Sequence, residues 1–285
     1  MQLDHRLPSA AVPDAADPAW IRVRCSDPGD GAAPRSWVLL VHGYLASMDW
    51  GFLPWLEREL LSRDLGVVAV TLSGSGFEDD ASRVTHTEAF ARNTYAGELA
   101  DLAAVHAWLE AERPAGFDLE RAGVWGHSRG SAMALVHASE VGGYSALCTW
   151  ASVGSVGRYD PHRIVEWQAK GFLTVETAGG QKLRLERDLY DDFTGNAARY
   201  DLPRRAADWR APALLVHGER DRSVPVDEAT EHAGRFGGPG ARVHVVGRAG
   251  HNFGTRHPCE RPGPALAEAL KVTGDFFEST LLPRA

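Results

Sequence analysis

Six short apolar runs recur along the chain, and stretches with helical periodicity separate them. Each run is nearly continuously apolar rather than alternating, which is typical of parallel strands covered on both faces. The runs span residues 37–43, 66–72, 121–127, 145–151, 212–218 and 241–247. Helical patterns cover residues 52–64, 88–112, 129–140, 226–236 and 264–281. This alternation predicts an α/β fold, with a mostly parallel central sheet and helices on both of its faces.

The alternation is interrupted once, between about Ser155 and Asp208, where no strand–helix unit fits. Within this stretch, residues 172–187 predict a hairpin, because two alternating runs flank Gly179 and Gly180. Charged and aromatic residues surround the hairpin. We expect the segment 155–208 to be a lid or cap, inserted into one α/β domain that spans residues 1–285.

The composition indicates a large core and argues against several classes of partner. The chain has 285 residues, of which 44% are hydrophobic, and a net charge of −8, which disfavours nucleic acids and anionic membrane surfaces. Its three cysteines lie far apart and fit neither a disulfide framework nor a zinc spacing. The N-terminal stretch lacks the apolar segment of a secretory signal, and no run approaches the roughly 20 residues of a membrane span. We therefore expect a cytoplasmic protein.

One serine lies between two glycines in the stretch VWGHSRGSAMAL, residues 124–135. The pattern Gly126-x-Ser128-x-Gly130 is weak by itself, since glycine-rich chains produce it by chance. Here an expected strand precedes it and an expected helix follows it, with small residues on the turn. This context is typical of a nucleophile elbow, where bulky neighbours would collide. The alternative is an ordinary strand-to-helix turn that contains glycine.

A serine hydroxyl becomes a good nucleophile only when a base accepts its proton and an acid orients that base. In this topology the expected order along the chain is serine, then Asp or Glu, then histidine. Asp221 follows the expected strand 212–218, and His251 follows the expected strand 241–247. Each residue therefore lies in a loop at the carboxyl end of a strand, in the required order. Taken alone, either could be an ordinary surface loop residue.

Two other histidines lie near His251 in the sequence. His244 is inside an expected strand, so its side chain should point to a face of the sheet rather than beyond the strand end. His257 precedes Pro258, which favours extended backbone there. We therefore expect His251 to be the general base.

Backbone amides of two loops are candidates for the oxyanion hole. The first is the N–H of Arg129, directly after the serine, and the second is the N–H of Tyr44, in the loop after strand 37–43. The side chain of Arg129 has two interpretations, an internal pair with Asp or Glu or a contact to an anionic substrate group. Tyr44, Trp50 and Trp167 are candidate substrate contacts, although such aromatic residues are also typical of a core.

Four blocks of the sequence carry a resemblance to a known family. They are HGYLASMDWGFLP (42–54), GHSRGS (126–131), HGERDRSVP (217–225) and GRAGHNFG (247–254). The chain resembles an α/β-hydrolase of the bacterial branch called prolyl-oligopeptidase-like or serine-aminopeptidase-like. The resemblance implies an eight-stranded fold with a cap, and Ser128, Asp221 and His251 as catalytic triad. Ala46 and Ser131 depart from it, because relatives often have glycine at both positions.

These observations predict a serine hydrolase that cleaves a small-molecule carboxylic ester through an acyl-enzyme. The chemistry requires no metal and no cofactor. One alternative is another reaction on the same triad, namely cleavage of a peptide, an amide, a thioester or a carbon–carbon bond. The other is a non-catalytic ligand-binding protein on the same scaffold. The fold does not define the substrate.

Overall fold

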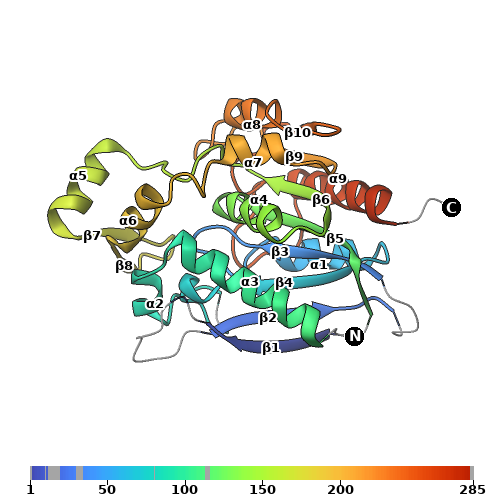
Figure 1. The fold of residues 1–285 in the computed structure, drawn as a ribbon, viewed down its shortest axis with the longest axis horizontal. Coiled ribbons are helices and arrows are strands. Elements are labelled where there is room, and N and C mark those ends of the chain that lie inside the picture. Colours follow the sequence, from blue (N-terminus) through green and yellow to red (C-terminus); the bar gives the residue numbers. More distant parts are fainter. Residues whose placement is uncertain are drawn as a thin grey trace.

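A computed structural model describes residues 2–9, 11, 20–29, 35–79, 81–112 and 116–282 of the chain. An eight-stranded sheet runs through the molecule in the order β1-β2-β4-β3-β5-β6-β9-β10 (Figure 1). β1 and β2 are antiparallel to their neighbours, and the other strands pair in parallel. The strands are β1 Gln2–Pro8, β2 Trp20–Ser26, β3 Arg35–Val41, β4 Gly66–Thr71, β5 Phe117–His127, β6 Tyr144–Trp150, β9 Ala213–Gly218 and β10 Ala241–Val246.

The six strands predicted from apolar runs are all present, with bounds that differ by at most four residues. The antiparallel strands β1 and β2 were not predicted. Most side chains of β1 are exposed, so its sequence QLDHRLP carries no apolar run. The mostly parallel sheet is confirmed, and two antiparallel strands extend it at one edge.

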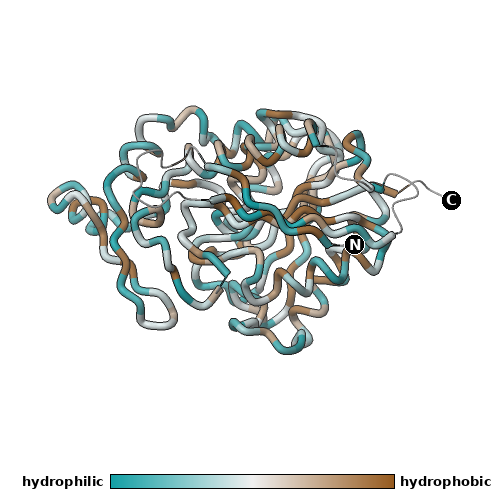
Figure 2. The backbone as a smooth tube through the Cα atoms, turned by 90° about the horizontal axis from the view of Figure 1, so that it is seen from below, coloured by the Kyte–Doolittle hydropathy of each residue, from teal (hydrophilic) through white to brown (hydrophobic). Residues whose placement is uncertain are grey.

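Helices cover both faces of this sheet, as the sequence predicts. The residues of β3 alternate between two cores: Leu39 and Val41 pack with α3 and α4 on one face, and Val38 and Leu40 pack with α1 and α9 on the other. Figure 2 shows the hydrophobic segments gathered along these central strands. The helices outside the segment 155–208 are α1 Leu53–Leu61, α2 Thr87–Ala91, α3 Tyr95–Glu112, α4 Arg129–Val141, α8 Val226–Ala233 and α9 Pro264–Leu281. No helix in the described part of the chain is long and apolar enough to cross a membrane.

The single helix predicted over residues 88–112 is wrong, because the chain leaves helical geometry between α2 and α3. The Thr94 hydroxyl accepts a hydrogen bond from the Gly97 N–H at 3.0 Å, so Thr94 caps the start of α3. The side chain of Asn93 donates to Glu98 at 2.8 Å. These two polar side chains begin a new helix where periodicity alone predicts continuity.

The segment 155–208 lies between β6 and β9 and adds no strand to the main sheet. Its elements are α5 Pro161–Lys170, β7 Phe172–Glu176, β8 Lys182–Glu186, α6 Asp188–Gly195 and α7 Leu202–Asp208. β7 and β8 pair antiparallel, which confirms the predicted hairpin. In Figure 1, α5, α6 and the hairpin extend beyond one end of the sheet, next to α2. The role of this segment as a mobile cap stays a prediction.

Candidate active site

Ser128 lies on the sharp turn between β5 and α4. Its backbone has φ 53° and ψ −121°, a strained conformation for a residue other than glycine. A Cβ atom on Gly126 would lie 2.3 Å from the Gly130 carbonyl oxygen, and one on Gly130 would lie 2.3 Å from the His42 carbonyl oxygen. Both positions therefore require glycine, because the turn packs directly against neighbouring backbone.

Asp221 and His251 meet at the same end of the sheet, although they follow the different strands β9 and β10. His251 Nδ1 lies 2.7 Å from Asp221 Oδ2. The other carboxylate oxygen accepts the N–H groups of Ser223 at 2.8 Å and Val224 at 2.9 Å. Because Nδ1 donates its proton to Asp221, the neutral imidazole leaves Nε2 free to accept a proton.

The Asp221 side chain is fully buried, yet it is held in its ionised form. Burial alone would raise the pKa of this carboxyl group. Hydrogen bonds from His217, His251 and the Val224 N–H outweigh burial and hold its pKa well below the usual range. An ionised Asp221 is the form that orients the imidazole and stabilises an imidazolium.

Asp221 has a second histidine partner that sequence reasoning missed. His217 Nε2 lies 3.4 Å from Asp221 Oδ2 and 2.8 Å from the Val224 carbonyl oxygen, which accepts its proton. The side chain of His217 has no exposed surface. It can therefore support the carboxylate, but it offers no access to a substrate.

His127 and His42 were also missed, and they position the loops around the site. His127 Nε2 donates to the His251 carbonyl oxygen at 3.1 Å, and burial lowers the pKa of His127 to about 3, so its ring is neutral. His42 Nε2 accepts the Leu72 N–H at 3.0 Å, so its Nδ1 donates to the Gly43 carbonyl oxygen at 2.8 Å. One feature of the sequence could have pointed to them, because His42 directly precedes Gly43 and His127 directly precedes Ser128. Their tautomers, however, can be assigned only from the hydrogen-bond partners in the structure.

The candidate oxyanion loop lies directly against the serine. A Cβ atom on Gly43 would be 3.4 Å from Ser128 Cβ and 2.8 Å from His127 Nδ1. Within the described ranges, neither the Tyr44 N–H nor the Arg129 N–H donates to another group. Two backbone N–H groups, one adjacent to Ser128 and one adjacent to Gly43, thus remain available as candidate oxyanion donors.

The Arg129 side chain forms the internal pair that the sequence analysis considered. Its Nη1 lies 3.2 Å from Glu98 Oε1, and its Nη2 donates to the Tyr159 hydroxyl at 3.2 Å. The guanidinium carbon lies 4.1 Å from the ring centre of Tyr44 and 5.0 Å from that of Tyr95. This arrangement places the Arg129 side chain between the candidate oxyanion loop, α3 and the segment 155–208.

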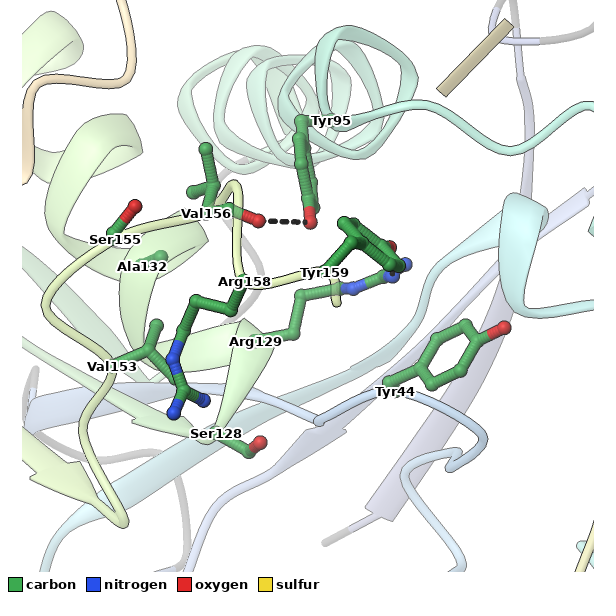
Figure 3. Close-up of a pocket in the computed structure, with 10 residues that line it drawn as sticks. All are labelled: Tyr44, Tyr95, Ser128, Arg129, Ala132, Val153, Ser155, Val156, Arg158 and Tyr159. Atoms are coloured by element: carbon green, nitrogen blue, oxygen red, sulfur yellow. Dashed lines mark hydrogen bonds between the residues drawn. The ribbon is translucent and has the colours of Figure 1, made fainter. Parts of the chain in front are cut away.

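A cavity of about 200 Å³ opens at Ser128 (Figure 3). Aromatic, aliphatic and basic side chains form most of its wall. The lining residues are Tyr44, Tyr95, Ser128, Arg129, Ala132, Val153, Ser155, Val156, Arg158 and Tyr159.

Of the three expected substrate contacts, only Tyr44 lines this cavity. Trp167 is fully buried within the segment 155–208, where its indole N–H donates to the Leu185 carbonyl oxygen at 3.2 Å. Trp50 packs against Phe52 and His257 on the other side of the sheet. Both tryptophans serve as packing residues, which composition alone does not distinguish from pocket residues.

The two alternative histidines have partners elsewhere. His244 Nε2 lies 2.8 Å from Glu268 Oε1 on α9. His257 Nδ1 accepts the Gly51 N–H at 3.1 Å. In the part of the chain that the structure describes, the histidines bonded to Asp221 are His217 and His251, and of these His251 is the accessible one.

Comparison with known proteins places the chain in a family. The model of the prolyl oligopeptidase family matches residues 53–262. No curated protein sequence gives a significant match. Solved structures with a similar fold include a putative hydrolase from Agrobacterium vitis S4, which is 16% identical with a TM-score of 0.71 over 99% of this chain and 100% of that one. Est1E from Butyrivibrio proteoclasticus is 12% identical, with a TM-score of 0.66 over 96% of this chain and 98% of that one.

The esterase domain of a Rhodothermus marinus protein is similar in the same way. It is 17% identical, with a TM-score of 0.64 over 99% of this chain and its full length. At these identities the likeness shows the fold, and the family follows from the match of the family model. Since that match covers more than half of the sequence, the chain belongs to the prolyl oligopeptidase family and has the α/β-hydrolase fold.

Proposed function

We propose that this protein is a serine hydrolase that cleaves carboxylic esters through an acyl-enzyme. The observation that carries the proposal is the 2.7 Å contact between His251 and the ionised Asp221, at the end of the sheet where Ser128 occupies its strained turn. Ester hydrolysis needs a nucleophile, a base and an oriented acid, and these three residues supply them.

The reaction begins when Ser128 Oγ attacks the ester carbonyl carbon while His251 Nε2 accepts the hydroxyl proton. The N–H groups of Tyr44 and Arg129 donate to the oxygen that becomes negatively charged, and such a donor contributes roughly 3 kcal/mol to transition-state stability. His251 then gives its proton to the departing alcohol, which leaves an acyl group on Ser128. Water, deprotonated by His251, releases the acid and restores the free enzyme.

A peptidase is the second candidate, because the matching family is named for an oligopeptidase. The composition of the cavity wall favours the ester reaction over an aminopeptidase. An enzyme that binds a free amino terminus needs an acidic group near the nucleophile, whereas the described lining contains arginines and no Asp or Glu. p-Nitrophenyl esters and aminoacyl p-nitroanilides, assayed side by side, separate the two reactions.

A fluorophosphonate probe should label the wild-type protein at Ser128 and leave Ser128→Ala unlabelled. The probe reacts with serines that a neighbouring base activates, so labelling reports the function of the triad rather than the presence of a serine. Mass spectrometry of the labelled peptide identifies the site. Ser131→Ala is a suitable control, because Ser131 also lies on the elbow but its hydroxyl bonds the Ser128 carbonyl oxygen at 2.6 Å. Labelling of another residue, or equal ester turnover by Ser128→Ala, would contradict the mechanism.

Shortening the hairpin is expected to change the preference for acyl chain length more than it changes stability. The hairpin residues Val175 and Leu183 pack in the same small apolar cluster as Tyr44, which lines the cavity. Removal of Gly179 and Gly180 alters the loop that positions Gln181, whose side-chain amide bonds the backbone of Val84. The kcat/KM values for p-nitrophenyl acetate, butyrate and octanoate should shift relative to one another.

The melting temperature of the shortened variant provides the comparison. In a chain of this size, a change in melting temperature below about 2 °C corresponds to less than about 1 kcal/mol of stability. If the melting temperature collapses while the chain-length preference stays fixed, the segment 155–208 is part of the structural core rather than a cap that selects substrates.

A further inference from the structure

The charged side chains that line the described cavity at Ser128 are all positive. Two guanidinium groups, from Arg129 and Arg158, contribute to its described wall, and no carboxylate does. Their acidic partners, Glu98 and Glu228, are not among the lining residues. A ligand in the cavity therefore meets positive groups first, in a partly enclosed space where charge interactions are weakly screened.

The two arginines differ in how much of their hydrogen-bonding capacity remains available. Arg129 is enclosed by Glu98, Tyr159 and two aromatic rings, and its side chain is 11% exposed. Arg158 is 30% exposed, and only its Nη2 has partners, at 2.9 Å from Glu228 and 3.2 Å from the Ser223 carbonyl oxygen. In the described structure its Nε and Nη1 groups donate to no acceptor. Arg158 thus keeps three N–H donors for a ligand.

The position of Arg158 is fixed by the fold rather than by flexible surface contacts. Glu228 is itself held in place, because its Oε1 accepts the Gly154 N–H at 2.8 Å. Glu228 belongs to α8, and Ser223 lies in the loop that carries Asp221. An arginine anchored at one nitrogen loses less side-chain entropy when it binds a ligand, so its remaining donors are preorganised.

Figure 3 shows how the two side chains are directed. Arg158 extends from the segment above the cavity towards the side formed by Val153 and Ser128, whereas Arg129 extends towards Tyr159. Apart from Ser128 and Ser155, the remaining wall consists of aliphatic residues and tyrosines, which suit the apolar body of a ligand. The cavity thus combines an apolar wall, a nucleophile and a set of cationic donors.

We propose that Arg158 binds a carboxylate carried by the substrate, so that the enzyme prefers esters bearing a second, free carboxylate group. This inference rests on the proposed ester hydrolysis at Ser128, and it adds the substrate class and the residue that selects it. A guanidinium matches a carboxylate in charge and geometry, and hydrogen bonds between charged groups are about twice as strong as neutral ones.

Paired substrates test this preference. The mono-p-nitrophenyl ester of glutaric acid and p-nitrophenyl pentanoate have acyl chains of equal length, with and without a carboxylate. 4-Acetoxybenzoate and its methyl ester place the same difference in the alcohol part. The wild type should show a higher kcat/KM for the anionic member of at least one pair. Arg158→Gln should reduce that preference by about 10-fold or more, mainly through KM, as expected for the loss of a hydrogen bond between charged groups.

Two further variants separate substrate binding from a structural role of Arg158. Glu228→Gln removes the counter-charge and leaves the guanidinium, so the preference for the anionic ester should persist or increase. Arg187→Gln, a matched arginine of the same segment that pairs with Asp191 on the surface, should leave the preference unchanged. If Arg158→Gln lowers kcat/KM for both esters of a pair equally, so that their ratio stays constant, Arg158 only stabilises the loop that carries Asp221. That result would overturn the proposal.

Binding to the inactive Ser128→Ala protein decides the inference even if no ester is hydrolysed. Calorimetry should show that monomethyl glutarate binds at least about 10-fold more tightly than dimethyl glutarate, and that Arg158→Gln in this background removes the difference. Equal affinity for the two compounds would overturn the proposed carboxylate site. Failure of ester turnover with this binding difference intact would overturn the proposed function alone.

Discussion

Replacement of His251 with alanine is expected to lower kcat for p-nitrophenyl butyrate by about four to six orders of magnitude, as loss of a triad base does in other serine hydrolases. In the proposed mechanism the imidazole accepts and returns the serine proton, and no other accessible histidine in the described chain contacts Asp221. The fold should persist, because the His251 side chain is 21% exposed and lies in a loop. Steady-state kinetics and circular dichroism measure the two effects separately.

His257→Ala and His244→Ala are the controls for this variant. His257 supports the Gly51 N–H, and His244 pairs with Glu268 at the surface, so both substitutions should change stability more than kcat. Loss of activity in His257→Ala together with full activity in His251→Ala would refute the assignment of the base. Ser128→Ala and Ser128→Ala/His251→Ala should have similar residual rates, because residues of one triad act together and their effects do not add.

Gly130→Ala is expected to destabilise the protein by about 3 kcal/mol or more, a cost in the range of severe overpacking. The added methyl group would lie 2.3 Å from the His42 carbonyl oxygen and 2.5 Å from that of Val41. Val41 is the last residue of β3, which pairs with strands on both sides, and His42 follows it directly, so a shift of these backbone atoms would disturb the end of the strand. Urea unfolding gives the change in the free energy of unfolding.

Gly195→Ala is the matched control. Gly195 ends α6, and a Cβ atom there would meet no heavy atom within 4 Å. Alanine also has the higher helix propensity, so this variant should be neutral or slightly more stable than the wild type. Equal losses of stability in Gly130→Ala and Gly195→Ala would show that the close packing of Gly130 against the backbone of Val41 and His42 does not affect the free energy of unfolding.

The parts of the fold that the sequence predicts are those where hydrophobic burial and chain geometry agree. A central strand such as β3 is buried on both faces, so an apolar run identifies it. β1 lies at an edge with most of its side chains exposed, and its strand conformation depends on pairing with β2, which its own sequence does not encode. The break before α3 depends on a hydrogen bond to Thr94, which periodicity cannot detect.

The candidate triad is predictable for a related reason. Ser128, Asp221 and His251 each follow a strand, and the carboxyl ends of parallel strands meet at one edge of the sheet. His42, His127 and His217 contribute through burial and the direction of each N–H, which depend on residues distant in the sequence. Arg158 cannot be identified from the sequence as a residue of the cavity at Ser128 either. The two residues come together only when the segment 155–208 packs on the sheet.

The contacts of Arg129 have a consequence for how such proteins diverge. Its side chain contacts Glu98 of α3, Tyr44 of the candidate oxyanion loop and Tyr159 of the segment 155–208, and Arg129 directly follows Ser128 in the chain. A segment 155–208 acquired from a relative by recombination would therefore be compatible only with a scaffold that retains this set of partners. We expect new substrate ranges to arise more readily by substitutions inside the existing segment than by exchange of the whole segment, because this segment and the turn at Ser128 share the buried Arg129 guanidinium.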